Sequence, residues 1–304
     1  MGRVIEIADP LVNLSIKRGF VVVKINDIEK TQIPTDDIEV LILNGTGASI
    51  TTNLLNQLLN CGAMVIVLGE NYSPSGIFYP TDPHFLHKQK INLQINASKP
   101  LNKKLWQAVV KAKILNQSAI LAFFTKEDEK QLIELAKKVG SGDPENIEAQ
   151  AAKKYWQKLF GEDFRRDYAS TGINSMLNYG YAILRSATAR SIFSCGLNPV
   201  FGIHHHNLGN AFCLVDDLME PYRPIVDFIV KRITESKKDF KELNPEIKKT
   251  LSKVLTISLN SDEGIMPLNN SILRLCQSFV RSLENGEVIL KFPDSPLPID
   301  LEIL

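Results

Sequence analysis

The feature that most limits the possible folds is a change in hydrophobic periodicity near residue 100. Before it, short segments rich in Val and Ile are separated by turn residues, a pattern typical of strands. After it, apolar residues recur at helical spacing through most of the chain. A chain of 304 residues is also long enough for two domains. The sequence therefore predicts an α+β protein, with a small β-rich N-terminal domain followed by a larger all-helical C-terminal domain.

Domain boundaries follow from the same change. The β-rich domain is predicted over residues 1–80 and the helical domain over residues 101–290. Residues 81–100 are polar and resemble a linker, and residues 291–304 form a Pro-rich, extended tail. The expected strands are Arg3–Ala8, Leu11–Lys17, Gly19–Ile25, Ile38–Leu43 and Ala63–Leu68, with a helix at Thr51–Cys61.

The second domain is expected to consist of long helices. One of them should begin with Asp143 as N-cap and Pro144 in the first turn, because both residue types favour those positions. The other long helices are predicted at Asn102–Phe124, Glu127–Val139, Asp167–Ser194, from Pro224 to about Ile233, and at Leu268–Leu283.

Composition excludes several classes of protein. With 44% hydrophobic and 23% charged residues, general disorder is excluded. No apolar run approaches the ~18 residues of a membrane span, so no membrane partner is expected. Four cysteines without a CxxC pair indicate free thiols in a cytoplasmic protein. The net charge is +1, but an excess of Lys and Arg lies in residues 101–253, which suits either a polyanionic partner or a solvated helical surface.

One stretch concentrates groups that bind metals. His204, His205 and His206 are followed about a dozen residues later by Asp217 and Glu220, which are spaced to share one helix face. Imidazole combined with carboxylates suits Mg²⁺ or Mn²⁺, and zinc is disfavoured because no Cys pair accompanies them. The alternative is a helix start, with Asp217 as N-cap and Glu220 as the third helical residue. Spacing alone leaves both interpretations open.

Two other helices place polar side chains on faces that should pack. Glu148 lies on the same face as Ala152 and Tyr155, where an unpaired charge would be costly. Its partner is either a metal ion or the N-terminus of its own helix. Asn174 and Asn178 lie within a long apolar helix, where asparagine is unfavourable unless it is hydrogen-bonded. Hydrogen bonding in the core and positioning of a ligand are both possible roles for them.

Four motifs occur in a specific order. They are Glu148-x-x-x-Ala152-x-x-Tyr155-Trp156, Asn174-x-x-Leu177-Asn178-Tyr179-Gly180-Tyr181, Gly202-x-x-His205 and Asp217-Leu218-Met219-Glu220-Pro221-Tyr222-Arg223. Together they resemble the CRISPR-associated adaptation integrases, the metal-dependent subunits that insert new spacers into CRISPR arrays. The resemblance covers nearly the whole chain. The Gly-Ile-His-His form and the Phe160-Gly161-x-Asp163-Phe164 stretch are most similar to versions from type II systems.

The resemblance implies a set of site residues. Glu148, His205 and Glu220 would be the metal ligands for Mg²⁺ or Mn²⁺, and Asp217 a supporting catalytic carboxylate. It is the resemblance, and not the spacing, that selects His205 among the three histidines. Candidate contacts to DNA are Arg223, Lys153, Arg185, His204, His206 and Lys248.

The resemblance also implies a reaction and partners. The 3′-hydroxyl ends of spacer-precursor DNA would be joined to the CRISPR repeat by transesterification, both substrates being double-stranded DNA. The β-rich domain would pair into a homodimer, and a small ferredoxin-like second adaptation protein would join the complex. The alternatives are a non-catalytic DNA-binding scaffold and a metal-dependent phosphodiesterase outside CRISPR adaptation.

Overall fold

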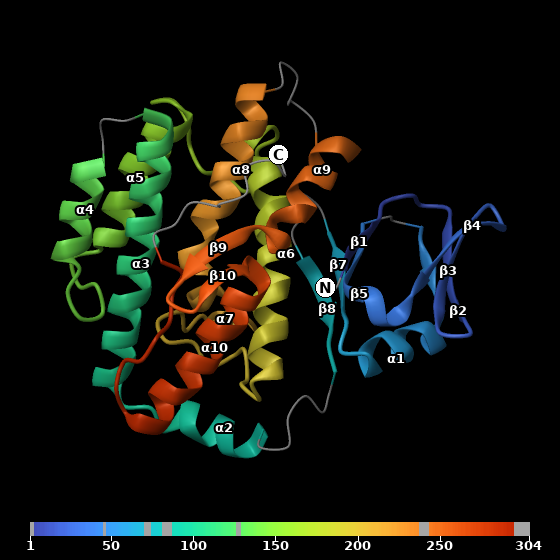
Figure 1. Cartoon of the computed structure of the whole chain (residues 1–304), viewed down its shortest axis with the longest axis horizontal. Helices are drawn as coiled ribbons and strands as arrows, with labels where there is room; N and C mark the ends of the chain where they lie inside the picture. The colour runs from blue at the N-terminus through green and yellow to red at the C-terminus, as the bar shows by residue number, and fades with distance from the viewer. Residues whose placement is uncertain are drawn as a thin grey trace. The chain divides into compact units, whose positions relative to one another are not determined.

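The computed structural model describes residues 3–44, 47–69, 74–80, 87–125, 129–236 and 243–294. The chain divides into two compact units, Met1–Pro83 and His84–Leu304. Strands dominate the first and helices the second (Figure 1), which confirms the predicted α+β class. Most of the predicted Pro-rich tail, residues 295–304, lies outside the described residues.

Among its described residues, the first unit contains two four-stranded sheets, the 3₁₀ turn η1 (Thr35–Asp37) and one α-helix. The first sheet has the order β1 (Arg3–Ile7), β5 (Ile38–Leu43), β7 (Met64–Leu68), β8 (Pro74–Phe78). The second has the order β4 (Ile28–Pro34), β3 (Phe20–Ile25), β2 (Val12–Lys17), β6 (Ser49–Ile50). Helix α1 (Thr52–Asn60) follows β6 and contributes Leu54 and Leu58 to the core shared with the two sheets.

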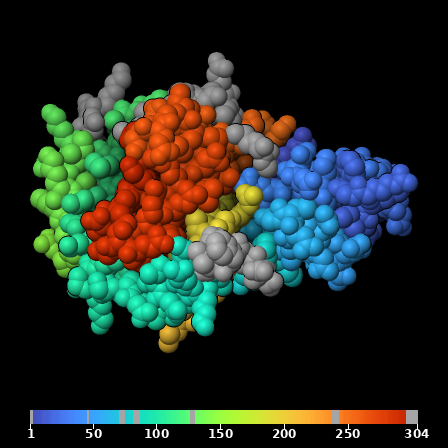
Figure 2. Space-filling model, turned by 60° about the horizontal axis from the view of Figure 1, so that its bottom comes forward, coloured from blue at the N-terminus to red at the C-terminus, as the bar shows by residue number. Residues whose placement is uncertain are grey.

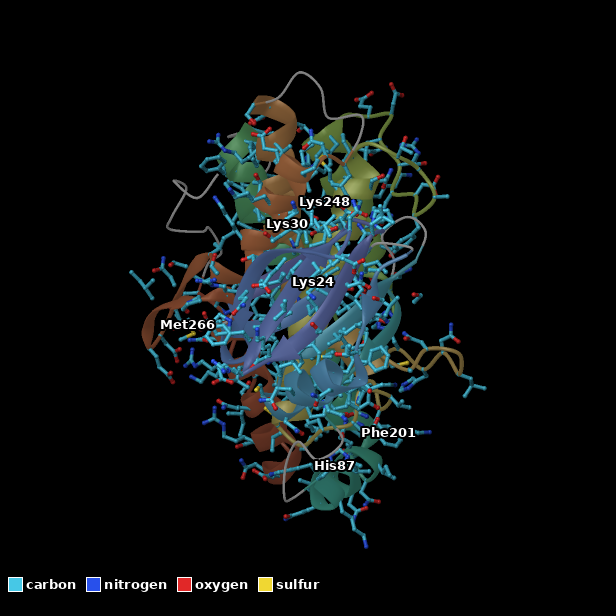
Figure 3. All side chains as sticks on the ribbon, turned by 90° about the vertical axis from the view of Figure 1, so that its right-hand side faces the viewer. Lys24, Lys30, His87, Phe201, Lys248 and Met266 are labelled. Atoms are coloured by element: carbon cyan, nitrogen blue, oxygen red, sulfur yellow. The ribbon has the colours of Figure 1, made fainter. Side chains whose placement is uncertain are left out.

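In this unit the apolar strands are buried and the polar strand is exposed. Strand β5, which is apolar except for Glu39, is buried because it pairs in parallel with β1 on one side and β7 on the other. Strand β4 was not predicted, because its Ile-Glu-Lys-Thr-Gln sequence is exposed and lacks apolar alternation. Lys24 on β3 and Lys30 on β4, two neighbouring strands of the second sheet, are labelled in Figure 3.

The second unit is built around one buried helix. It contains α2 (His87–Ile95), α3 (Lys99–Thr125), α4 (Glu129–Lys138), α5 (Ile147–Phe160), α6 (Ile173–Ser194), α7 (Cys213–Met219), the 3₁₀ turn η3 (Glu220–Tyr222), α8 (Arg223–Ser236), α9 (Pro245–Ser252), the 3₁₀ turn η4 (Lys253–Thr256) and α10 (Leu268–Asn285). Helix α6 packs against α7, α8, α9 and α10. At Gly180 an added Cβ would lie 2.4 Å from Val226 Cγ1, so glycine permits the close contact between α6 and α8. An antiparallel hairpin, β9 (Ser258–Ser261) and β10 (Gly264–Pro267), was not predicted in this unit.

The linker prediction for residues 81–100 is wrong where the structure describes them. Residues 87–95 form α2, and α3 begins at Lys99. Polar contacts fix α2: Lys90 pairs with Glu284, and Gln94 exchanges hydrogen bonds with the backbone of Asn198. His87, which is labelled in Figure 3, has its Nδ1 atom 3.0 Å from the Gly196 carbonyl oxygen. Figure 2 shows α10 beside this teal segment, consistent with the contacts between α10 and α2. The polar segment of residues 87–95 is therefore a helix that packs on the rest of the second unit, and not a linker.

Two predicted helix starts are also wrong. Helix α5 begins at Ile147, and its N-cap is Asn146, whose side-chain oxygen accepts a hydrogen bond from the Ala149 N–H group. The Asp143 carboxylate still accepts hydrogen bonds from the N–H groups of Ile147 and Glu148. Helix α6 begins at Ile173, six residues after the predicted start at Asp167. In the part of the chain that is described, no helix combines the length and apolarity needed to cross a membrane.

Candidate active site

Asp217 organises the loop that carries His204, His205 and His206. Its side chain is fully buried, and it accepts hydrogen bonds from the N–H groups of Ile203, His204 and His205 at 2.5, 3.0 and 3.3 Å. Asp217 lies inside α7, whose N-cap is Phe212. The helix-start interpretation of Asp217 is therefore wrong. Its carboxylate binds backbone N–H groups of the preceding loop and not those of its own helix.

The same carboxylate orients His205. Asp217 Oδ1 lies 2.6 Å from His205 Nδ1, which directs the other ring nitrogen, Nε2, away from Asp217. This is the arrangement that holds metal-binding imidazoles in proteins. The hydrogen bond to Asp217 raises the pKa of His205, although partial burial opposes it. The ring is 44% exposed and accessible to a ligand.

Trp106 on α3 supports the loop from the other side. Its ring stacks on His204, with centroids 4.3 Å apart and planes at 3°. It meets the His205 ring edge-on at 5.7 Å. Partial burial lowers the pKa of His204, which favours the neutral, stacked imidazole. The sequence analysis missed Trp106, because an aromatic residue in an apolar helix is usually only a core residue.

Gly202 explains the Gly-x-x-His motif physically. A Cβ at this position would lie 2.3 Å from the His205 carbonyl oxygen, 2.8 Å from Cys213 Cβ and 2.9 Å from Asp217 Oδ2. Two of these neighbours are backbone or Cβ atoms that cannot rotate away. Glycine is therefore required for the loop to wrap around the Asp217 carboxylate.

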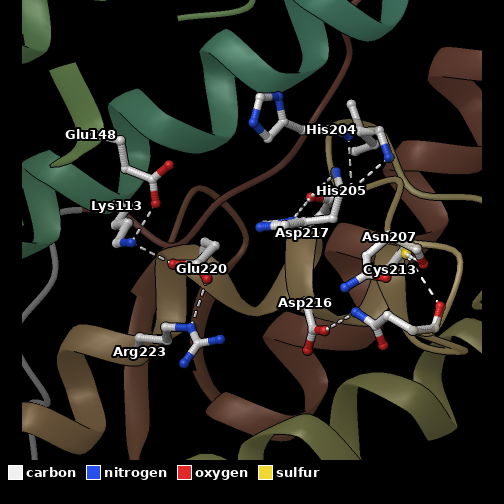
Figure 4. A network of polar contacts seen from close by, with 12 residues as sticks. Lys113, Glu148, His204, His205, Asn207, Cys213, Asp216, Asp217, Glu220 and Arg223 are labelled. Atoms are coloured by element: carbon white, nitrogen blue, oxygen red, sulfur yellow. Dashed lines mark hydrogen bonds and ion pairs between the residues drawn. The ribbon is translucent and has the colours of Figure 1, made fainter. Parts of the chain in front are cut away.

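A buried lysine joins the two predicted glutamate ligands. Lys113 Nζ on α3 lies 2.6 Å from Glu148 Oε1 on α5 and 2.5 Å from Glu220 Oε2 in η3 (Figure 4). Arg223 Nε lies 2.7 Å from the other Glu220 oxygen, Oε1. Two carboxylates and two cations thus form one cluster. The partner of Glu148 in this structure is Lys113. Glu148 also lies in the first turn of α5, so the N-terminus of its own helix is near it, as one of the two interpretations expected.

Charge pairing controls ionisation in this cluster. Burial alone would raise the pKa of Glu220, but Arg223 and Lys113 outweigh it, so the net shift is downward. Burial would lower the pKa of Lys113, but Glu220 and Glu148 outweigh it, so the net shift is upward. Glu220 is therefore an anion and Lys113 a cation at neutral pH. Sequence reasoning missed Lys113, although its position four residues after Val109 places it on the apolar face of α3, which is a usable signal.

In this structure a lysine lies between the two glutamates predicted to bind a metal ion. Among the described residues, no three His, Cys, Asp or Glu side chains form a group that could hold a metal ion. Instead, the Lys113 ammonium stands as a cation between Glu148 and Glu220. Glu220 Oε2 is buried and has no hydrogen bond, so its contact with Lys113 is charge pairing alone. Two carboxylates and an imidazole suit Mg²⁺ or Mn²⁺. The donor set therefore fits such an ion once the ammonium gives way.

A cavity of about 240 Å³ adjoins the cluster. It is lined by Lys113, Gln117, Ala152, Trp156, Arg166, Tyr168, Tyr181, His205, Glu220, Arg223 and Asp227. Among the predicted site residues, His205, Glu220 and Arg223 therefore face the same space, whereas Glu148 reaches it through Lys113. Burial raises the pKa of Asp227 to about 7, and a hydrogen bond from the Tyr181 hydroxyl opposes this shift.

The other predicted DNA contacts have diverse surroundings. Lys153 on α5 and His206 are exposed. Lys248 on α9 lies over the Tyr179 ring, 5.8 Å from its centroid, and is labelled in Figure 3. Arg185 is bound to Asp216 at 2.7 and 2.9 Å and to Asn210 at 3.2 Å, so its charge is already paired within the fold. The structure thus gives Arg185 a role in holding the loop before α7.

Comparisons with known proteins agree with the motifs. The family model described as CRISPR associated protein Cas1 matches residues 6–254. The chain is 38% identical over 284 residues to the CRISPR-associated endonuclease Cas1 of Neisseria meningitidis serogroup C, covering 92% of each.

Two solved structures share the fold. One is a casposase bound to integration product, with a TM-score of 0.83 and 21% identity over 98% of this chain and 95% of that one. The other is a Cas6-RT-Cas1–Cas2 complex, with a TM-score of 0.78 and 18% identity over 96% of this chain and 36% of that one. The resemblance inferred from the four motifs is thereby confirmed: the chain belongs to the Cas1 family of CRISPR-associated proteins.

Proposed function

We propose that this protein is a metal-dependent DNA integrase and endonuclease of CRISPR adaptation, acting in the cytoplasm. The observation that carries the proposal is that Glu148 and Glu220, from two separate segments, share the Lys113 ammonium, while Glu220 and His205 line one cavity beside it. The endonuclease name of the Neisseria relative and the integration product bound by the casposase support the same chemistry.

The proposed reaction is transesterification of DNA. The 3′-hydroxyl oxygen of the incoming spacer precursor attacks a phosphorus atom in the CRISPR repeat. A new P–O bond forms as the existing one breaks, and the departing oxygen takes up a proton. Glu148, His205 and Glu220 would hold Mg²⁺ or Mn²⁺, which supplies charge stabilisation at the reacting phosphate. The nucleophile comes from the substrate, so the protein needs none of its own.

The protein's own side chains prepare this site. Asp217 fixes the His205 ring so that its Nε2 atom is available. Arg223 keeps Glu220 ionised through a contact of 2.7 Å. Burial of the cluster lowers the local dielectric, so each charge acts more strongly on the phosphate than it would in water.

Strand transfer of a labelled duplex into a plasmid carrying a CRISPR repeat tests the function. Glu148→Gln and Glu220→Gln remove charge from the predicted ligands while keeping side-chain shape. We expect both variants to lose joining by at least about 100-fold, as loss of central electrostatic groups commonly does, and to keep DNA binding. Glu145→Gln, an exposed change just before α5, is the control. Joining that persists in both ligand variants would refute the site, and equal joining without added metal would refute the metal requirement.

The same proposal includes partners. Double-stranded spacer-precursor DNA and the CRISPR repeat would be the substrates, and the β-rich domain would form a homodimer. A small ferredoxin-like second adaptation protein would bridge two such dimers, a proposal supported by the solved complex whose title includes Cas1 and Cas2. Mass measurement in solution should give twice the 34.0 kDa of one chain. A monomer at micromolar concentration would contradict the dimer.

A further inference from the structure

Arg166 is a cavity-lining arginine that the sequence analysis did not single out. It lies in the loop between α5 and α6 and is half-buried. Its Nη1 donates to Asn174 Oδ1 at 2.9 Å, and its Nη2 donates to Asn178 Oδ1 at 2.5 Å. The two asparagines project from the first two turns of α6. This resolves the open question about them, because their amides hold a cavity-lining arginine.

The asparagines also fix the loop that carries Arg166. The Asn174 side chain donates to the carbonyl oxygen of Arg165 at 3.1 Å. The Asn178 side chain donates to the carbonyl oxygen of Tyr168 at 3.0 Å. Each amide therefore orients the guanidinium with its oxygen and the loop backbone with its nitrogen. The position of Arg166 is set by directed bonds from a rigid, buried helix.

Amide oxygens orient an arginine without neutralising it. Arg185 and Arg223 each pair with a carboxylate. Between described residues, no ion pair joins Arg166 to a carboxylate. Its guanidinium lies instead over the Tyr168 ring, 4.3 Å from the centroid. Stacking on an aromatic face leaves the outer edge of a guanidinium available for hydrogen bonds. Arg166 thus brings an oriented positive charge to the cavity wall, and the carboxylate nearest to it in the chain, Asp167, is exposed to solvent.

The location of this charge points to its ligand. Arg166 and Arg223 lie over the same Tyr181 ring, at 5.5 and 4.7 Å from its centroid. Both line the cavity that also exposes His205 and Glu220. A planar guanidinium matches two oxygens of a phosphate group. A cationic ligand would be repelled by it, and a neutral one would lack the charge attraction.

We propose that Arg166 binds a phosphate group of the DNA strand that enters this cavity. Asn174 and Asn178 act as positioning residues that present its guanidinium. The inference rests on the proposed function, because it requires DNA as the ligand. It adds a contact to a substrate phosphate beside the predicted metal ligands, distinct from those ligands.

The salt dependence of DNA binding distinguishes this role from a purely structural one. Each phosphate contact contributes about one unit to the slope of log K against log salt. A labelled DNA duplex with 3′ overhangs is titrated with the full chain in EDTA, so that metal binding does not enter. We expect Arg166→Gln to weaken binding about tenfold at low salt and to reduce the slope by about 1. Arg165→Gln, an exposed neighbour whose side chain binds only backbone carbonyls, should change neither.

Two further variants separate charge from orientation. Arg166→Lys should keep the slope, because the charge remains, but recover only part of the affinity. Asn174→Ala should also keep the slope while weakening binding, because the charge stays and its position is lost. Thermal melting of each variant identifies any that fail to fold. If Arg166→Gln is one of them, the affinities of Arg166→Lys and Arg165→Gln are compared, and only that of Arg166→Lys should be weaker than wild type.

The possible results separate the two proposals. An unchanged slope in folded Arg166→Gln would overturn the phosphate contact while leaving the integrase proposal intact. Strand transfer that survives Glu220→Gln would overturn the metal site, whereas the slope change would still establish the Arg166 contact. Failure of the wild-type chain to bind the duplex at low salt would overturn both.

Discussion

Replacing Lys113 with Met should destabilise the metal-free protein and tighten its binding of Mn²⁺. In the present arrangement one ammonium balances Glu148 and Glu220 simultaneously. Methionine has a similar length but no charge, so the change leaves two carboxylates without their shared ammonium, and Arg223 still pairs with Glu220. A divalent cation entering that gap would restore the balance without having to displace an ammonium.

The magnitude follows from a thermodynamic cycle. The Lys113 side chain is 12% exposed and that of Glu220 is 8% exposed, so these pairs are buried. Removing one partner of a buried ion pair costs about 3–5 kcal/mol. With metal bound, the carboxylates are neutralised independently, and the cost should fall to about 1 kcal/mol, the usual range of an ordinary substitution. The difference, about 2–4 kcal/mol, corresponds to binding that is about 30-fold to 800-fold tighter.

Two measurements check this prediction. Calorimetric titration with Mn²⁺ gives the affinity, and thermal melting in EDTA and in Mn²⁺ gives the stability of each state. Lys104→Met, which removes an exposed lysine from the same helix, is the matched control and should change neither quantity appreciably. Equal Mn²⁺ affinity in wild type and Lys113→Met, with both folded, would refute the competition between ammonium and metal. Weaker binding in Lys113→Met would show that the lysine supports the ion.

Three further predictions follow from single residues. Gly202→Ala should cost about 1–3 kcal/mol and weaken Mn²⁺ binding, because the new Cβ overlaps the His205 carbonyl; native melting and affinity would contradict the close contact. Asp217→Asn should lower the pKa of His205 in an NMR titration, since Asp217 is what raises it; an unchanged pKa would contradict that cause. Asp227 has a folded pKa of about 7 against about 3.9 unfolded, so its contribution to stability is fully present below pH 4 and is lost as pH rises through 7. Asp227→Asn should therefore gain up to about 4 kcal/mol relative to wild type between pH 4 and pH 8, measured by urea unfolding; parallel pH profiles would contradict the raised pKa.

The strands of the first unit and the long helices of the second were predictable because burial repeats along them. Strand β7 is apolar throughout and lies inside its sheet, whereas β4 was not predicted because most of its side chains are exposed. Helix α2 was not predicted from the sequence for a related reason. Lys90 and Gln94 bury polar groups through specific partners almost 200 and about 100 residues away, and no local pattern contains that information.

The candidate site was predictable only in part. The motifs identified Glu148, His205 and Glu220, but the structure was needed to show two more side chains of the site, Lys113 and Trp106. Lys113 stands among other lysines of α3, and Trp106 among apolar residues, so their types alone do not distinguish them. Their roles arise when α3 packs against α5 and η3. Tertiary packing, not sequence spacing, brings these groups together.

The central claim is that Glu148, His205 and Glu220 hold one divalent cation. Crystals soaked in Mn²⁺, with diffraction data collected at the manganese absorption edge, would locate the ion directly. The account predicts one strong anomalous peak between the two glutamates and His205 Nε2, with Lys113 Nζ displaced from its position between the carboxylates. A stoichiometric Mn²⁺ bound elsewhere, with Lys113 still joining Glu148 to Glu220, would contradict it.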